Sequence, residues 1–468
     1  MPARLSKLSI NTSCMDYAHP WTDSCVSATT GLGLHTLQES FKIYTTVYII
    51  AFLMKRRVPS KRDIKKIILG ILQSTAFLSW SGFSYSLFIC LLRRILGRFY
   101  LPTVSFLPSF LSSLSAIVIE RSSRRTLLCL YVSNIATETL FRMGVWRGYF
   151  SPIPKGEVYI FAVSVAVLLY FFRAKINKQD QIHKILRVIV GRYEEAEYFT
   201  RRNLHFETYS KNTEIDNTEN DRNIQRRSFK NSRLNILQKS FEAYKCIINT
   251  LKAQSKHASC PHPYSCAHYI LMDSARIFSY IVCGQITLKL IFQCKRLFQK
   301  PKLLKMIIFQ RENLNLAIFL GGFTGLYRLM SCLLRRIFHK DSCTYAIPAG
   351  LVASITFMAY PNTTVALYFM WKALQLLWND AAENGKVPEI KWFVIFLYCF
   401  STATLFHAAI IEPQNLRSSY WRFLYNVSGG RIAAMSRLSL NIFGLETNKN
   451  LQEVLRKTKT TDQINYSF

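Results

Sequence analysis

The hexapeptide Cys90-Leu91-Leu92-Arg93-Arg94-Ile95 recurs unchanged as Cys332-Leu333-Leu334-Arg335-Arg336-Ile337, 242 residues further along the chain. Beyond it, with a shift of two residues, Leu107-Pro108-Ser109 aligns with Ile347-Pro348-Ala349. An apolar stretch precedes each hexapeptide, and further apolar stretches follow it. A repeated block of hydrophobic segments indicates a membrane unit that has been duplicated within one chain.

Composition supports a membrane protein. Half of the 468 residues are hydrophobic, and the mean hydropathy is +0.11. With 18 Gly and 14 Pro the chain is not of low complexity. Long charge-free runs without β alternation favour helices, because a lone strand in lipid leaves its backbone unpaired. We therefore predict an all-α, polytopic membrane protein with two related bundles of about four spans each, joined by a polar linker.

The formal charge of +33 comes largely from short basic clusters beside apolar runs. Clusters in such places meet anionic lipid head groups, at about 1 kcal/mol for each cation, so we expect the bilayer as partner and no nucleic acid. The clusters fall at both ends of successive spans, without the alternation of secretory-route proteins. Residues 1–40 also lack a sustained apolar core. Both features favour a mitochondrial or peroxisomal membrane. The clusters are Lys55-Arg56-Arg57, Arg93-Arg94, Arg121 with Arg124-Arg125, and Arg335-Arg336.

Changes in hydropathy and charge divide the chain into six predicted segments. These are a Cys-containing N-terminal region with a short apolar helix (1–66), a first transmembrane bundle (67–172), a polar, partly disordered linker (173–245), a Cys/His segment with an apolar helix (246–302), a second bundle (303–411) and a polar tail (412–468). The predicted spans are 67–92, 99–119, 126–141 and 158–172 in the first bundle, and 314–334, 344–360, 363–378 and 390–411 in the second.

Cysteine and histidine gather in two places. Cys14, His19 and Cys25 lie near the N-terminus, and Cys260, His262, Cys266 and His268 form a Cys-x-His-x3-Cys-x-His pattern. Zinc accepts four such ligands, so the two segments would share one structural zinc site if they met on one face of the membrane. The alternatives are a disulfide between Cys14 and Cys25, or reduced thiols, which a cytosolic location favours.

Six polar residues lie within predicted apolar helices, where an ionisable group needs a partner or a water-filled groove. Glu138 and Arg142 are four residues apart, which predicts an internal ion pair. Asn134 lies one turn earlier. Arg328, Lys372 and His407 lie in the second bundle. If Glu138, Arg328, Lys372 and His407 converged on one cavity, they would line a transport path; if each is paired in tight helix contacts, a structural role is favoured.

Several segments together resemble the transmembrane protein 135 family. They include Cys14, His19, Trp21, Ser24 and Cys25, the ten residues 136–145 (Ala-Thr-Glu-Thr-Leu-Phe-Arg-Met-Gly-Val), Gly156-Glu157-Val158 and Ser419-Tyr420-Trp421. The second bundle also resembles the Tim channel superfamily of mitochondrial translocases. Ala349-Gly350 fits the small-Gly pair of that motif, but Ser354 replaces its last Gly. Phe338 and Ser342 occupy its Arg and Asp positions, which argues against translocation more than against the fold.

The resemblance implies a protein of mitochondrial and peroxisomal membranes that supports mitochondrial fission, peroxisome organisation or lipid metabolism, with a dynamin-related fission GTPase and lipids as partners. The alternative is a transporter or channel that moves a lipid, fatty acid or metabolite through a helical bundle. Phosphate-binding loops, Gly-x-Ser-x-Gly elbows and His-Glu-x-x-His motifs are absent from the sequence. We therefore predict that the chain is not an enzyme.

Overall fold

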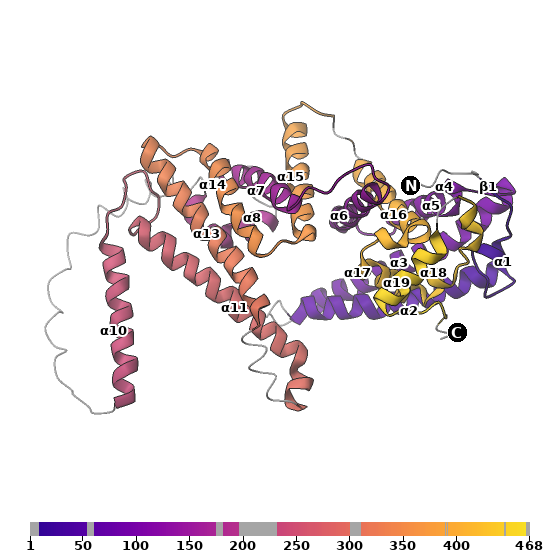
Figure 1. The fold of residues 1–468 in the computed structure, drawn as a ribbon, viewed down its shortest axis with the longest axis horizontal. Helices are drawn as coiled ribbons and strands as arrows, with labels where there is room; N and C mark the ends of the chain where they lie inside the picture. Colours follow the sequence, from indigo (N-terminus) through magenta and orange to yellow (C-terminus); the bar gives the residue numbers. More distant parts are fainter. Residues whose placement is uncertain are drawn as a thin grey trace. The chain divides into compact units, whose positions relative to one another are not determined.

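The computed structural model describes residues 9–53, 60–174, 181–195, 232–299, 310–388, 390, 392–443 and 446–464. Within these ranges the chain is almost entirely helical (Figure 1). It divides into two compact units, which are described separately. Unit 1 combines Met1–Ile153 with Pro388–Phe468, and unit 2 is Pro154–Val387. The prediction of an all-α, multi-span protein is confirmed.

Unit 1 is built on the pair of long helices α2 and α3. Helix α5 packs on α3, α16 packs on α5, and α6 packs on α16. A short two-stranded sheet and the C-terminal helices complete it. Its elements are β1 (Ser9–Ile10), α1 (Cys14–Tyr17), α2 (Cys25–Leu53), α3 (Lys61–Leu96), β2 (Phe99–Tyr100), α4 (Leu101–Val104), α5 (Phe106–Ile117), α6 (Ser122–Trp146), α16 (Phe393–Ile411), η4 (Pro413–Asn415), α17 (Ser418–Ser428), α18 (Arg431–Ala434), η5 (Leu438–Phe443) and α19 (Thr447–Thr458).

The ends of α3 follow from local sequence. Ser60 and Asp63 form a capping box at its start, which satisfies backbone N–H groups that lack helical partners. At its end Gly97 takes a φ of 69°, and its N–H donates to the carbonyl of Arg93 at 3.0 Å. A left-handed residue at this position favours glycine. The helix therefore stops directly after the hexapeptide, and β2 begins two residues later.

Unit 2 is built on the pair α11 and α13, with α7 packed against α14 and α15. Its elements are α7 (Gly156–Arg173), α8 (Gln181–Ile189), η1 (Arg192–Glu194), α10 (Ser232–Ala253), α11 (Cys266–Gln299), α13 (Arg311–Phe338), η2 (Cys343–Tyr345), α14 (Ala346–Ala353), η3 (Ser354–Ala359) and α15 (Thr363–Glu383). The stacked rings of Phe161 and Phe357, with centroids 4.1 Å apart, lie at the centre of its core.

Small residues bring the paired helices of each unit close together. In unit 1 the Ser79 hydroxyl donates to the Gly33 carbonyl at 3.1 Å across α2 and α3. In unit 2 the Ser274 hydroxyl donates to the Gly321 carbonyl at 2.6 Å across α11 and α13. A Cβ atom on Gly321 would lie only 3.0 Å from the Cβ of Phe278. Such close approach is how helices associate where lipid supplies no hydrophobic driving force.

The units do not follow the predicted segments, because one helix of each half packs in the other unit. Helix α7 follows α6 in the chain and fell within the predicted first bundle (67–172), yet it belongs to unit 2. Helix α16 follows α15 and fell within the predicted second bundle (303–411), yet it packs on α5 and α6 in unit 1. Hydropathy locates an apolar helix but does not say which neighbour it will contact.

Four described helices are long and apolar enough to cross a membrane, namely Lys61–Leu96, Gly156–Arg173, Leu314–Phe338 and Phe393–Ile411. Each unit therefore has two, where the sequence predicted about four. The predicted spans 99–119 and 344–360 fold as short apolar helices, Phe106–Ile117 and Cys343–Ala359. Helices α6 and α15, at 126–141 and 363–378, fall outside the four because both carry several charged side chains.

Two segments predicted to be polar contribute to the cores. In the predicted linker (173–245), α8 buries Ile182 and Leu186, and Val190 directly after it is buried too, so that buried residues recur every four positions. The remaining linker residues 175–180 and 196–231 lie outside the described residues. In the predicted tail (412–468), Trp421 and Phe443 are fully buried. The tail is polar on average, but its helices are amphipathic and cover unit 1.

A disulfide tests the placement of α16 in unit 1. The hydroxyls of Ser133 on α6 and Ser401 on α16 lie 3.1 Å apart. We expect the double variant Ser133→Cys/Ser401→Cys to form this bond under mild oxidation, because its side chains are already within reach. The measurement is peptide mapping of the oxidised protein by mass spectrometry. The matched control pairs Ser401→Cys with Thr137→Cys, one turn further along α6. Equal cross-linking of both pairs would contradict the described packing.

Candidate metal centres

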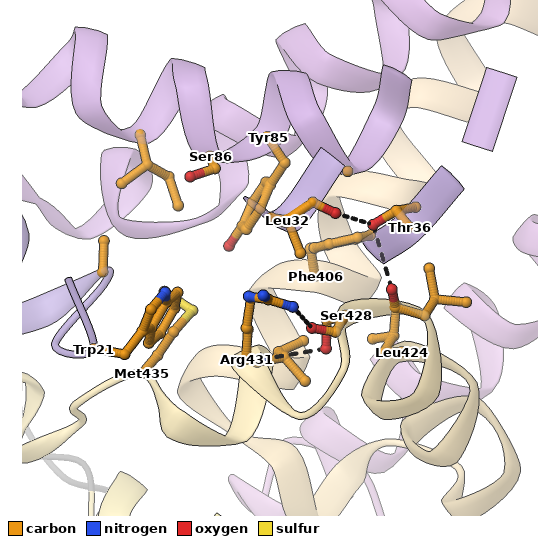
Figure 2. A pocket seen from close by; sticks show the side chains of 15 residues that line it. Trp21, Leu32, Thr36, Tyr85, Ser86, Phe406, Leu424, Ser428, Arg431 and Met435 are labelled. Carbon is orange, nitrogen blue, oxygen red and sulfur yellow. Dashed lines mark hydrogen bonds between the residues drawn. The ribbon is translucent and has the colours of Figure 1, made fainter. Parts of the chain in front are cut away.

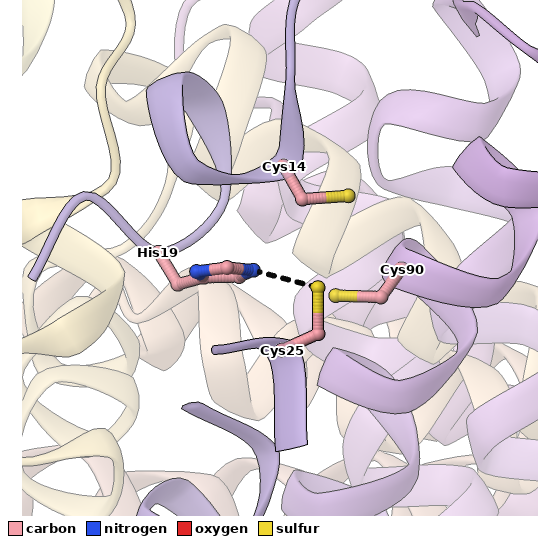
Figure 3. A group of neighbouring side chains, drawn as sticks. All are labelled: Cys14, His19, Cys25 and Cys90. Atoms are coloured by element: carbon pink, nitrogen blue, oxygen red, sulfur yellow. Dashed lines mark hydrogen bonds between the residues drawn. The ribbon is translucent and has the colours of Figure 1, made fainter. Parts of the chain in front are cut away.

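Four side chains converge at one end of the α2–α3 pair (Figure 3). Cys14 comes from α1, His19 from the loop that follows, Cys25 from the first turn of α2 and Cys90 from near the end of α3. Their ligand atoms all lie within 4.8 Å of one another. We call this group centre 1.

Contacts that do not involve the thiols bring centre 1 together. Strand β1 pairs antiparallel with β2, so the start of the described chain lies beside the end of α3. Arg93, one turn beyond Cys90, donates from Nε to the Thr12 carbonyl at 2.7 Å. The segment that carries Cys14 is thereby fastened to the helix that carries Cys90.

His19 is oriented as a metal ligand would be. Its side chain is buried, and its Nδ1 lies 2.9 Å from the carbonyl oxygen of Thr22. A carbonyl only accepts, so Nδ1 carries the proton and Nε2 keeps its lone pair. Nε2 faces the group and lies 3.3 Å from the Cys25 Sγ. Metal-binding histidines are held in this way by a hydrogen bond from the second ring nitrogen.

A second group of the same composition lies in unit 2. Cys260 and His262 come from the loop before α11, Cys266 is the first residue of α11, and Cys332 lies near the end of α13. Their ligand atoms also lie within 4.8 Å of one another. We call this group centre 2. It is the more enclosed of the two, because Cys260, His262 and Cys332 are all buried, whereas Cys25 of centre 1 is exposed.

The spacing of these atoms suits a tetrahedral ion. Zinc–sulfur bonds of about 2.3 Å place neighbouring sulfur atoms about 3.8 Å apart. In centre 2 the Sγ atoms of Cys260 and Cys266 are 3.8 Å apart. The Cys332 Sγ lies 3.6 Å from the His262 Nε2. Three sulfur ligands and one imidazole form a set that selects zinc over hard cations such as magnesium or calcium.

Each centre favours one thiolate, the form of cysteine that binds metal. A hydrogen bond from Cys90 lowers the pKa of the Cys14 thiol to about 6, although partial burial opposes the shift, and the nearby His19 adds to the lowering. In centre 2, hydrogen bonds from Cys260, Cys332 and His262 hold the pKa of the Cys266 thiol well below its usual range.

Cys90 and Cys332 complete the two centres, and the sequence analysis did not identify either as a ligand. Both are the first residue of the duplicated hexapeptide, and both lie six residues before the end of their helix. The distance from the third ligand is 65 residues in centre 1 and 66 in centre 2. The identical position in the repeat was the available signal, but a separation of this size hides the partnership from local spacing.

His268, a predicted ligand, lies outside centre 2. It is two residues beyond Cys266 in α11, which turns its side chain about 200° around the helix axis. Its ring packs edge-on against Tyr264, with centroids 5.0 Å apart, and Cys332 is the fourth member of centre 2. The seven predicted residues therefore do not form one shared site: two separate centres lie in separate units. Cys14 and Cys25 are free thiols.

Comparison with known families identifies the chain. Residues 11–145 match the family model described as the N-terminal cysteine-rich region of Transmembrane protein 135. This match supports membership of the chain in the transmembrane protein 135 family. The match and the four apolar helices together support a membrane protein. The matched region contains every residue of centre 1 and none of centre 2. No solved structure matches the chain.

The second copy of the hexapeptide also carries a buried ion pair in unit 2. Arg335 donates to both carboxylate oxygens of Glu194, at 2.9 and 2.7 Å, and to Asp341 at 2.9 Å. Arg335 and Glu194 are fully buried. Burial raises the pKa of Glu194, but the charge and hydrogen bonds of Arg335 outweigh it and lower the pKa to about 2.

The polar residues predicted at membrane depth are paired within their own units. In unit 1 the Glu138 carboxylate accepts from Arg142 at 2.5 Å and forms a second ion pair with Arg417 of the C-terminal segment. In unit 2 Arg328 pairs with Asp273 at 2.6 Å and donates to the Val190 carbonyl at 2.9 Å.

The other three polar candidates also contact neighbours within a single unit. Lys372 donates to Gln375 at 2.9 Å. The His407 ring packs edge-on against Phe106, with centroids 6.2 Å apart, and Asn134 is buried on α6. Glu138 and His407 thus lie in unit 1, and Arg328 and Lys372 lie in unit 2.

A small pocket of about 70 Å³ lies in unit 1 between α2, α3, α16, α17 and α18 (Figure 2). Its walls are mainly apolar, and the Arg431 guanidinium points into it from α18. Trp21 and Ile89 connect its lining to centre 1, because they lie close in sequence to His19 and Cys90. This volume holds only a few water molecules. None of the four residues predicted for a transport path lines it.

The Glu194–Arg335 pair predicts an acid-sensitive unit 2. Because the folded pKa of about 2 lies below the ordinary value of 4.5, the pair stabilises fully above pH 4.5 and loses its contribution as pH falls towards 2. Glu194→Gln should lower the unfolding free energy at pH 7 by about 3 kcal/mol, because it leaves a buried arginine poorly paired. It should also flatten the pH dependence in this window.

The measurement is thermal unfolding in detergent between pH 2 and 7. The matched control is Glu195→Gln, because Glu195 is more exposed and its partners His183 and Arg187 lie 3.5 and 3.4 Å away. Equal effects of the two variants at every pH would show that Glu194 is not the group responsible.

Proposed function

We propose that the chain is a multi-pass protein of mitochondrial and peroxisomal membranes that supports mitochondrial fission, peroxisome organisation or lipid metabolism without catalysing a reaction itself. Family membership and the basic clusters beside apolar helices support this proposal. A dynamin-related fission GTPase and membrane lipids are the proposed partners. The observation that carries the adaptor role is the pairing of charges inside each unit.

A transport path through a bundle needs ionisable side chains that face water or substrate. Glu138 is engaged by two arginines, and Arg328 by an aspartate, a backbone carbonyl and the face of Tyr269 at 4.4 Å. These contacts leave the charges satisfied by the protein itself. They favour a rigid membrane scaffold over a channel.

Loss of this protein from cultured cells should lengthen mitochondria and change peroxisome number, because fission then lacks its membrane support. Fluorescence microscopy of both organelles measures the effect. Re-expression of the wild type, or of Cys283→Ser, whose exposed thiol belongs to neither centre, should restore normal morphology. Unchanged organelles in cells that lack the protein would refute the proposed role.

A flux assay in proteoliposomes distinguishes the adaptor function from the transporter function. Purified protein should move labelled fatty acid or phospholipid no faster than empty vesicles do. Flux above empty vesicles that falls in the Arg328→Ala variant would instead establish the transporter function.

We further propose that centre 1 holds one structural zinc ion. Its three thiols and the oriented imidazole of His19 form a complete tetrahedral set, with the other ring nitrogen of His19 held by the Thr22 carbonyl. The set joins the start of α2 to the end of α3. A bound ion would therefore close the open end of this helix pair across a 65-residue loop.

Zinc removal should destabilise unit 1. An ion held a thousandfold above its Kd contributes about 4 kcal/mol, which corresponds to a decrease in Tm of about 10 °C in a unit of this size. Cys90→Ser should produce this decrease, and a chelator should then have little further effect on unit 1. Thermal unfolding in detergent checks it, with Cys283→Ser as the control. A Tm of Cys90→Ser equal to that of the wild type would contradict the proposal.

A further inference from the structure

We infer that centre 2 is a second zinc site, created with the first by internal duplication and filled independently of it. The inference rests on the zinc proposed for centre 1 and extends it to a part of the chain outside the family match. It assigns Cys260, His262, Cys266 and Cys332 as the four ligands, with the hexapeptide cysteine in the same role as Cys90.

The geometry of centre 2 fits the ion by itself. The sulfur atoms of Cys260 and Cys266 are separated by 3.8 Å, which is the edge of a zinc–thiolate tetrahedron and far beyond the roughly 2.05 Å of a disulfide. A disulfide between these two cysteines would also leave Cys332 and His262 without a role. Four metal-binding side chains in one enclosed place contribute little to apolar packing. They do supply all four ligands that a tetrahedral ion needs.

His262 is fixed in the binding orientation from two sides. Its Nδ1 donates to the Tyr264 carbonyl at 2.6 Å, which leaves the Nε2 lone pair directed at the Cys332 thiol. The face of its ring stacks on Tyr269, with centroids 4.6 Å apart and planes at 19°. His19 in centre 1 makes the equivalent bond to the Thr22 carbonyl. Both histidines therefore have the same tautomer and present the same nitrogen.

Comparison of the two centres shows what the repeat has kept. The order of ligands along the chain is Cys, His, Cys, Cys in both. The third ligand begins a long helix, Cys25 in α2 and Cys266 in α11, and the fourth lies six residues before the end of the partner helix. The loops between the first three ligands differ in length and sequence. A common bound ion explains why the ligand set is the same although the loops that supply it are not.

The position of centre 2 assigns it a mechanical role. It joins the start of α11 to the end of α13, the two helices that form the base of unit 2. Arg335, three residues after Cys332, fixes Glu194 of η1 beside the same helix end. Arg93, three residues after Cys90, fixes Thr12 in unit 1. Each copy of the hexapeptide thus holds the helix end in two ways. Its cysteine binds the ion, and its arginine contacts the adjoining segment of the chain.

The test is the zinc content of the purified full-length chain in detergent, measured by inductively coupled plasma mass spectrometry. The wild type should hold about two ions per chain, and Cys332→Ser and Cys90→Ser about one each. The double variant should hold none. Cys283→Ser, on the same helix as Cys266 but outside the centre, should keep both ions. After exchange of zinc for cobalt, the absorption of thiolate-bound tetrahedral cobalt should be twice as strong in the wild type as in either single variant.

The outcomes separate the two proposals. A wild type with about one ion that Cys90→Ser removes and Cys332→Ser retains would overturn centre 2 and leave centre 1 intact. A wild type without zinc would overturn both. The wild-type measurement does not depend on any variant folding. Cys332→His, which keeps a metal ligand in place, should retain more zinc than Cys332→Ser if position 332 binds the ion.

Discussion

Each unit is built on two long helices whose ends must be held together in a lipid bilayer, which does not itself drive helices to associate. Apolar helix faces are as well solvated by lipid as by each other, so association in a membrane depends on close packing and on specific polar contacts. The helix pairs α2–α3 and α11–α13 are each connected at one end by the chain. The opposite ends carry the Cys/His centres, where a bound ion would join the two helices.

The same end of each pair also carries the arginine of the hexapeptide. Arg93 donates to the carbonyls of Thr12 and Gly97 and to the amide oxygen of Asn11. Arg335 pairs instead with the buried carboxylate of Glu194. In both units the cysteine of the hexapeptide thus belongs to a Cys/His centre. The arginine of the hexapeptide contacts a different kind of partner in each unit. The charged partner makes the fastening in unit 2 sensitive to acid, since a carboxylate must stay ionised to hold it.

Exchange of one helix between the halves makes the two units interdependent. The core of unit 1 includes Leu405 and Ile410 of α16, which lie more than 280 residues after α3 in the chain. The core of unit 2 includes Phe161 of α7, which precedes the rest of that core. Neither half of the sequence contains a complete core. Unit 1 therefore cannot finish folding until the C-terminal part of the chain has been made, because its contacts are far apart in sequence.

The sequence by itself determined the helical class, the repeated hexapeptide, the Glu138–Arg142 spacing and three of the four side chains in each centre, because hydropathy and short spacings are local properties. Only the tertiary structure decided that α7 and α16 each pack in the other unit and that the tail buries Trp421. It also decided that Cys90 and Cys332 lie beside Cys and His side chains whose nearest member is about 65 residues away in the chain. The hydropathy pattern of the sequence indicates which face of a helix is apolar. Which surface covers that face, and which distant thiol completes a cluster, is settled only when the whole chain packs.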